Sequence, residues 1–144
     1  MTRIVNISGK DVLKRTALAK GEIKLKKSTV DAINTGRIEK GDVFSTAQMA
    51  GIMAVKNTPN LIPLCHNIPI EAVDISFEVG EEDIACNCEV TASFKTGVEM
   101  ESLAGVTAAL LCIWDMVKYL EKDEYGQYPT TSISDVKVVS KRKE

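Results

Sequence analysis

The sequence predicts an α+β fold in which helices cover one face of an antiparallel sheet. Residues 72–79 and 83–94 alternate apolar and polar side chains as half-buried strands do, and a short loop joins them as a hairpin. A long apolar helix is expected from about residue 99 to 121, followed by a last strand over 133–141. The 144 residues have the length of one domain, so we expect a single domain over 1–144.

Weaker signals locate the elements before the hairpin. Residues 3–8 alternate only loosely and predict a short strand or an arm, and residues 21–27 predict a half-buried strand. A short helix is expected from Ser28, a suitable N-cap with Asp31 three residues later, to Gly36.

A second helix is expected from Ser45, with Gln48 completing a capping box, to the stop signal at residues 57–59. Gly51 inside it costs about 1 kcal/mol relative to alanine, which indicates a close approach of backbones. From residue 21 the order is then strand, helix, strand, strand, helix, strand, the βαββαβ arrangement of a ferredoxin-like fold. The second helix and an extra N-terminal strand or helix are expected as additions.

The composition indicates a soluble intracellular domain. A net charge of −2 disfavours nucleic-acid binding, and the strand aromatics Phe77 and Phe94 lie on apolar faces. The chain does not begin as a secretory signal does, and its longest uncharged run, 102–114, is shorter than the roughly 20 residues that span a bilayer. The four cysteines are therefore expected as reduced thiols in the cytoplasm.

The segment 60–70 contains the only histidine, His66, beside Cys65 and between two prolines. Proline restricts its own backbone and that of the preceding residue, so this segment is expected to be neither helix nor central strand. Two interpretations of His66 stay open. It is either a core imidazole with hydrogen-bonded nitrogens or an active-site group held in a rigid loop.

The long helix carries four charges on an apolar background, namely Glu99, Glu101, Asp115 and Lys118. Asp115 and Lys118 are three positions apart and are neighbours on one face. Glu101 lies fourteen positions before Asp115, close to four turns, and shares that side. A solvated stripe with one weak ion pair explains this spacing. A functional site explains it too, since the apolar neighbours leave little room for a purely solvated face.

Two further features contain chemically useful groups. Lys40 and Asp42 flank a glycine just before a helix N-terminus, an arrangement that can bind an anion but is common as a turn. Cys86 and Cys88 project from one side of a strand and, with Cys65 and His66, include metal-ligating atoms. Strict alternation with apolar residues favours core thiols, and no C-x-x-C pair supports zinc. We expect no metal site.

Three blocks stand out in order, KGDVFSTAQMAGIMAVKNTPNLIPLCHNIPI, KTGVEMESLAGVTAALLCIWDMVKYLEKD and ISDVKVVSK. Together they resemble the molybdenum cofactor biosynthesis protein C family, the cyclic pyranopterin monophosphate synthases. The resemblance runs from about residue 6 to 141. The combination of LIPLCH, TGVEME, and an Asp and a Lys three apart is very specific.

The resemblance implies an enzyme with a ferredoxin-like fold. Members convert a cyclised dihydro-GTP to cyclic pyranopterin monophosphate with release of diphosphate, a lyase reaction of molybdenum (or tungsten) cofactor and molybdopterin biosynthesis. They form hexamers, trimers of dimers, with each active site at a dimer interface, so the long helix is expected to be buried against a neighbouring subunit. The implied partners are a nucleotide-derived small molecule and further copies of the chain, without nucleic acid or membrane.

Residue by residue, the resemblance implies one pocket. Lys40 and Lys118 match the two catalytic lysines. Asp115 is expected to hold and tune Lys118, and His66 to contact the base or relay protons. The implied substrate-binding residues are Cys65, His66, Glu99, Met100, Glu101, Arg15, Lys10 and Lys141, the basic ones near the triphosphate. Acid–base groups and cations suit a reaction that moves several protons and expels diphosphate.

Two positions depart from the family pattern. Asn6 stands where many members have aspartate, and only three residues follow Lys141, so Lys141 is expected near a short, mobile end. No metal-ligand cluster is evident, so no cofactor is assigned, and whether Mg²⁺ assists the departure of diphosphate stays open. The alternative to the enzyme is a non-catalytic ferredoxin-like module that binds a small regulatory ligand.

Overall fold

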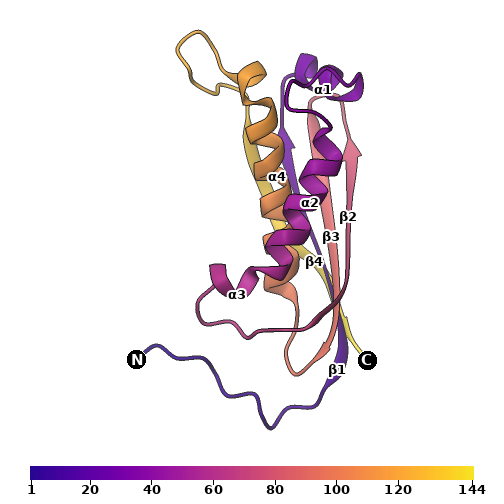
Figure 1. The fold of residues 1–144 in the computed structure, drawn as a ribbon, viewed down its shortest axis with the longest axis vertical. Coiled ribbons are helices and arrows are strands. Elements are labelled where there is room, and N and C mark those ends of the chain that lie inside the picture. Colours follow the sequence, from indigo (N-terminus) through magenta and orange to yellow (C-terminus); the bar gives the residue numbers. More distant parts are fainter.

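The computed structural model describes residues 1–144 and contains one four-stranded antiparallel sheet with helices on one face (Figure 1). The strands are β1 (Leu13–Lys24), β2 (Ile70–Val79), β3 (Asp83–Phe94) and β4 (Ser132–Lys143). Their order across the sheet is β2-β3-β1-β4. With the intervening helices this is the βαββαβ arrangement, so the predicted α+β, ferredoxin-like fold is confirmed.

The helices are α1 (Lys27–Asn34), α2 (Val43–Lys56), α3 (Thr58–Leu61) and α4 (Glu99–Glu121). Helices α2 and α4 lie against each other over the sheet, whereas α1 lies at one end of the molecule (Figure 1). The added helix is therefore α1, and the prediction that the second helix is the addition was wrong. Residues 1–12 form an arm with a turn at residues 8–9, so the predicted N-terminal strand is absent and the alternative of an arm is correct.

The core lies between the sheet and the two long helices. The inward positions of β3 are 0% exposed, namely Ile84, Cys86, Cys88, Val90 and Ala92. This confirms the strand and the face predicted from alternation. Gly105 of α4 lies directly over this strand, since a Cβ placed on it would be 2.6 Å from Cys88 Sγ.

Glycines set the spacing of the helix layer. A Cβ on Gly51 of α2 would contact the Ile75 side chain and would lie 3.0 Å from the backbone oxygen of Gly105. The close approach predicted at Gly51 is thus confirmed. On β1, a Cβ on Gly21 would lie 2.9 Å from Val106 and 3.0 Å from Leu110. Because α4 packs so closely on β1 here, the inward positions 17, 19 and 21 of that strand are alanine or glycine.

The same packing explains an error in the first strand. Residues 21–27 were expected to form it, but β1 begins at Leu13. Its added inward positions include Ala17 and Ala19, which are buried but too small to produce a strong alternation pattern.

Both predicted helix caps were also wrong. Helix α1 begins at Lys27 without a side-chain cap, and α2 is capped by Asp42, whose carboxylate accepts a hydrogen bond from Ser45 N at 3.0 Å.

One buried carboxylate joins three segments at the end of α4. Glu121 is 0% exposed and accepts hydrogen bonds from the hydroxyl groups of Thr29 and Thr131 and from Lys26 N. Lys26 Nζ also donates to the backbone oxygen of Leu120 at 3.2 Å. The end of α4 is thereby tied to the start of α1 and to the segment before β4. Buried polar groups of this kind are costly when a partner is lost.

We expect Glu121→Ala to lower the free energy of unfolding by about 3 kcal/mol, because two buried hydroxyl groups and one backbone N–H lose their acceptor. Urea unfolding followed by circular dichroism measures this change. Glu124→Ala is the matched control, because Glu124 is exposed in the loop after α4. A loss below about 1 kcal/mol for Glu121→Ala would contradict the structural role assigned to this carboxylate.

Candidate active site

Two ammonium groups flank one carboxylate in the last third of α4. Lys40 Nζ donates to Asp115 Oδ2 at 2.7 Å, and Lys118 Nζ lies 3.3 Å from Asp115 Oδ1. The three side chains are about half exposed, at 50%, 55% and 45% for Lys40, Asp115 and Lys118. The two lysines that the sequence predicts to act together therefore converge on the predicted aspartate. Pairs this exposed add little stability, so stability alone does not explain the cluster.

Helix geometry and one turn bring these groups together. Asp115 and Lys118 are neighbours because they are three residues apart in α4. Lys40 comes from the loop between α1 and α2, where Gly41 has a φ of +114°, a conformation that side chains rarely adopt. The N-terminus of α2 is occupied by the carboxylate of Asp42, and the Lys40 ammonium points to Asp115. The anion site considered at this helix N-terminus is therefore already filled by a side chain of the chain itself.

The pKa of Asp115 is lowered from its ordinary value of 3.8, first by the hydrogen bond from Lys40 and then by that from Lys118. The two ammonium groups thus favour the ionised form of this carboxylate. A fixed negative charge between two flexible lysines holds both ammonium groups at one point on the surface. Such groups can stabilise negative charge that develops on a phosphate or transfer protons.

A second group of charges lies at the start of α4. Lys141 Nζ binds Glu99 Oε1 at 2.9 Å, and Arg15 Nε donates to the backbone oxygen of Phe94 at 3.0 Å. These side chains line a cavity of about 200 Å³ between the end of the sheet and the segment before α4. Partial burial opposes ionisation of Glu99, but the hydrogen bond and charge of Lys141 keep its pKa below the ordinary value. Most of the charged residues that border the cavity are therefore cations.

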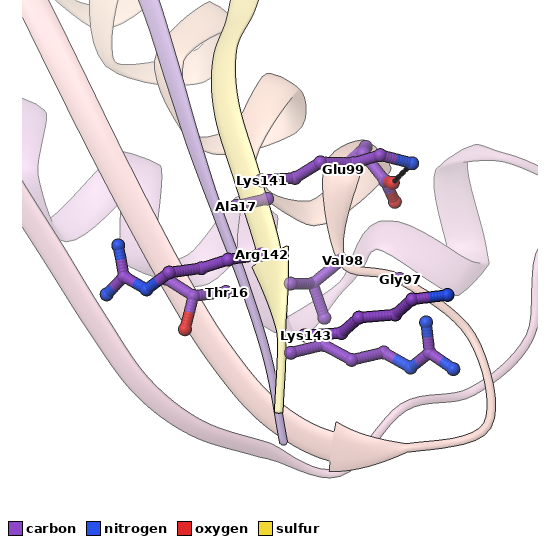
Figure 2. A pocket seen from close by; sticks show the side chains of 9 residues that line it. Thr16, Ala17, Gly97, Val98, Glu99, Lys141, Arg142 and Lys143 are labelled. Atoms are coloured by element: carbon purple, nitrogen blue, oxygen red, sulfur yellow. Dashed lines mark hydrogen bonds and ion pairs between the residues drawn. The ribbon is translucent and has the colours of Figure 1, made fainter. Parts of the chain in front are cut away.

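Lys143 also lines this cavity and was missed by the sequence analysis. It pairs with Arg15 across the sheet and lies two residues after Lys141, so both lysines project from the same side of β4. Figure 2 shows Lys141 and Lys143 on that side, whereas Arg142 and Thr16 point the other way. The expected mobile end was wrong, because β4 continues through Lys143. The signal available in the sequence was the period of two in a strand, which puts residues 141 and 143 of the basic run 141–143 on one side.

The first turns of α4 also carry a buried acid. Glu101 is 2% exposed, whereas Met100 beside it is 42% exposed. Burial raises the pKa of Glu101, and the charge of Glu99 adds to the effect. The pKa of Cys65 is raised in turn by burial and by the charge of Glu101, so Cys65 lies within electrostatic reach of this carboxyl group. A carboxyl group that keeps its proton to a higher pH than usual is better suited to act as a general acid.

His66 lies outside the core. It is half-buried in the segment after α3, and its Nε2 is 2.6 Å from the backbone oxygen of Val5 in the N-terminal arm. Lys95 Nζ binds the same arm at the oxygen of Ser8, at 3.2 Å. The interpretation as a core imidazole is therefore wrong. Lys10, predicted near the triphosphate, is exposed on the arm and does not line the basic cavity.

One chain does not bring all of the predicted residues into one pocket. Fourteen residues separate Glu101 from Asp115, which at 1.5 Å per residue is a distance of about 21 Å along α4. Arg15, Glu99, Lys141 and Glu101 therefore lie at one end of the molecule. Lys40, Asp115 and Lys118 lie in the loop after α1 and in the last third of α4. Figure 1 shows that this end of α4 is the one close to α1. The single pocket expected from the sequence is split in the isolated chain.

The cysteine pair belongs to the core. Cys86 and Cys88 are both 0% exposed, and burial raises the pKa of each thiol to about 12. Metal ligation requires the thiolate form, which these environments disfavour. The structure brings together no group of three or more His, Cys, Asp or Glu residues able to hold a metal ion.

We expect Glu101→Gln to stabilise the fold more at pH 7 than at pH 4. The unfolded chain releases the Glu101 proton near the ordinary pKa of 4.5, whereas the folded chain keeps it to higher pH. Between the two values the unfolded state binds fewer protons, so the stability of the parent falls as pH rises through this window. The glutamine does not titrate and avoids this loss. Urea unfolding of both proteins at pH 4 and pH 7 tests this prediction. An equal difference in the free energy of unfolding between variant and parent at both pH values would contradict the raised pKa of Glu101.

Comparison with known proteins gives one consistent result. The model of the MoaC family matches residues 4–144. A Pyrococcus abyssi protein named probable cyclic pyranopterin monophosphate synthase is 62% identical over 98% of this chain and 89% of its own length. A protein of the same name from Pyrococcus horikoshii is 63% identical over 98% of this chain and 89% of its own length. Another from Aeropyrum pernix is 56% identical over 97% of this chain and 96% of its own length.

Proposed function

Because this chain belongs to the MoaC family, we propose that it is a cyclic pyranopterin monophosphate synthase of molybdenum cofactor biosynthesis. Its substrate is then a cyclised dihydro-GTP, and its products are cyclic pyranopterin monophosphate and diphosphate. The observation that carries the proposal is the similarity to proteins of that name over nearly the full chain. The enzyme is a lyase, because closing the cyclic phosphate breaks the bond to the departing diphosphate.

The two charged groups suit different parts of this substrate. The cavity bordered by Arg15, Lys141 and Lys143 has the charge and the concave shape to receive the triphosphate. When a sugar hydroxyl attacks the first phosphate, negative charge develops on the diphosphate as it leaves, and cations at this position stabilise it. Lys40 and Lys118 supply the ammonium groups for proton transfer around the ring that is opened and reclosed. His66 and Glu101 are the further proton-transfer groups of the proposal.

A second copy of the chain would join the two groups into one site. If two copies pack with opposite directions of α4, the Glu101 end of one lies beside the Asp115 end of its partner. The helix layer has an apolar surface for such a contact, with Leu111 60%, Met49 58% and Met53 55% exposed. Helix α4 is long and apolar enough to span a membrane by length and composition. Only 44% of its most apolar window is buried within the chain, so much of its apolar surface is left uncovered. We propose that a neighbouring subunit covers the rest and that three such dimers form a hexamer in the cytoplasm.

The test is direct. The purified protein is incubated with the cyclised dihydro-GTP, and release of diphosphate and formation of cyclic pyranopterin monophosphate are followed by chromatography. We expect both products in equal amounts. The alternative, a non-catalytic module that binds a small regulatory ligand, predicts binding without either product. Binding of the substrate with no turnover would favour that alternative.

A further inference from the structure

The loop that carries Lys40 has a second anchor on α4. Glu39 N donates a hydrogen bond to the phenol oxygen of Tyr119 at 2.9 Å. Glu39 immediately precedes Lys40, and Tyr119 immediately follows Lys118. Tyr119 is 43% exposed, so its hydroxyl lies at the surface beside the cluster of Lys40, Asp115 and Lys118. The same helix therefore holds the backbone before Lys40 through Tyr119 and the ammonium of Lys40 through Asp115.

This loop is held at its two ends, by the buried side chains of Ile38 and Val43 and by the cap that Asp42 forms on α2. Residues 39–42 are exposed, and the turn depends on Gly41 with its positive φ. Inside the loop, Gly41 N binds the oxygen of Ile38 at 3.1 Å, and Ile38 is the buried side chain of this stretch. Between these ends, the hydrogen bonds that tie Glu39 and Lys40 directly to α4 are those to Tyr119 and Asp115. Asp115 and Tyr119 are four residues apart on one helical face, so the two anchors form a rigid pair.

We propose that Tyr119 is a positioning residue for Lys40 in the proposed synthase reaction, through the hydrogen bond from Glu39 N to its phenol oxygen. The inference rests on the proposed function. When the Lys40 ammonium leaves Asp115 to contact substrate, the Asp115 anchor is lost and the Tyr119 anchor remains. The backbone of Lys40 then stays at a fixed distance from Lys118. A catalytic group displaced by about 1 Å can lose a large factor in rate, so this anchor acts on the chemical step.

Tyr119→Phe tests the inference, because it removes only the acceptor oxygen and keeps the ring. We expect kcat to fall about tenfold and KM to change less than twofold, since positioning acts in the transition state. Hydrogen exchange of the peptide that covers residues 35–42 should become about three- to tenfold faster, the size expected for one lost hydrogen bond. Tyr125→Phe is the matched control, because Tyr125 is 78% exposed in the loop after α4. It should leave kcat, KM and exchange at 35–42 unchanged.

The outcomes separate this inference from the function on which it rests. A parent protein without turnover would overturn the proposed function, and with it the catalytic consequence of the anchor. An active parent with an equally active Tyr119→Phe variant would overturn the inference alone. Faster exchange together with unchanged kcat would show that the anchor exists but does not serve the reaction, and would also overturn the inference. A rise in KM with unchanged kcat would assign Tyr119 to substrate binding and contradict positioning.

Discussion

Lys118→Ala should lower kcat by about 10²–10⁴-fold while leaving the fold intact. The loss has this size because an acid–base or charge-stabilising group disappears from the site. Lys118 is 45% exposed and its only ion pair is with Asp115, so the free energy of unfolding should change by less than about 0.5 kcal/mol. Diphosphate release under single-turnover conditions measures the rate, and circular dichroism checks the fold. Lys40→Ala should behave in the same way.

Lys122→Ala is the matched control for this prediction. Lys122 follows α4 directly, is exposed and takes part in no ion pair of the chain. It should retain the parent rate. Turnover of Lys118→Ala at the parent rate would remove the ammonium pair from the mechanism, and the charge cluster would then be a surface feature without a catalytic role.

The sequence predicted the fold well wherever a single strand or helix carries its own signal. Strand β3 and helix α4 were predicted at their observed bounds, because alternation in one and a long apolar run in the other are local patterns. The start of β1 was missed because its inward side is built from alanine and glycine under a closely packed helix. The caps failed for another reason. Ser28 and Ser45 are suitable N-cap residues by type, but Asp is equally suitable, and α2 begins at Val43 with Asp42 as its cap.

The candidate site shows the same division between local and tertiary information. The Asp115–Lys118 pair followed from helical spacing alone, whereas the contact of Lys40 with Asp115 joins residues 75 positions apart and needed the family resemblance. Tyr119 was not identified, because nothing local indicates that its hydroxyl accepts a hydrogen bond from Glu39 N, 80 positions away. The predicted residues do not meet in one pocket of a single chain, because residues on one helical side can still be four turns apart along the axis. The pocket expected between two subunits stays a prediction.

That separation along α4 leads to a test of the shared site. If each site takes Glu101 from one chain and Lys118 from another, two inactive variants can restore each other. We expect co-expression of Glu101→Gln with Lys118→Ala to recover about a quarter of the parent activity. With random assembly, half of the sites receive an intact Glu101 and half of those receive an intact Lys118. Each variant alone should remain inactive.

The matched control is a chain that carries both substitutions, co-expressed with the parent chain. A shared site requires both of its chains to be parental in this mixture, so about a quarter of the activity is again expected. A site contained within one chain predicts a different pair of results, none for the two single variants and about half for this control. The two mixtures together therefore decide whether the groups at opposite ends of α4 meet across an interface. Activity in the control near one half, with none in the first mixture, would contradict the proposed dimer.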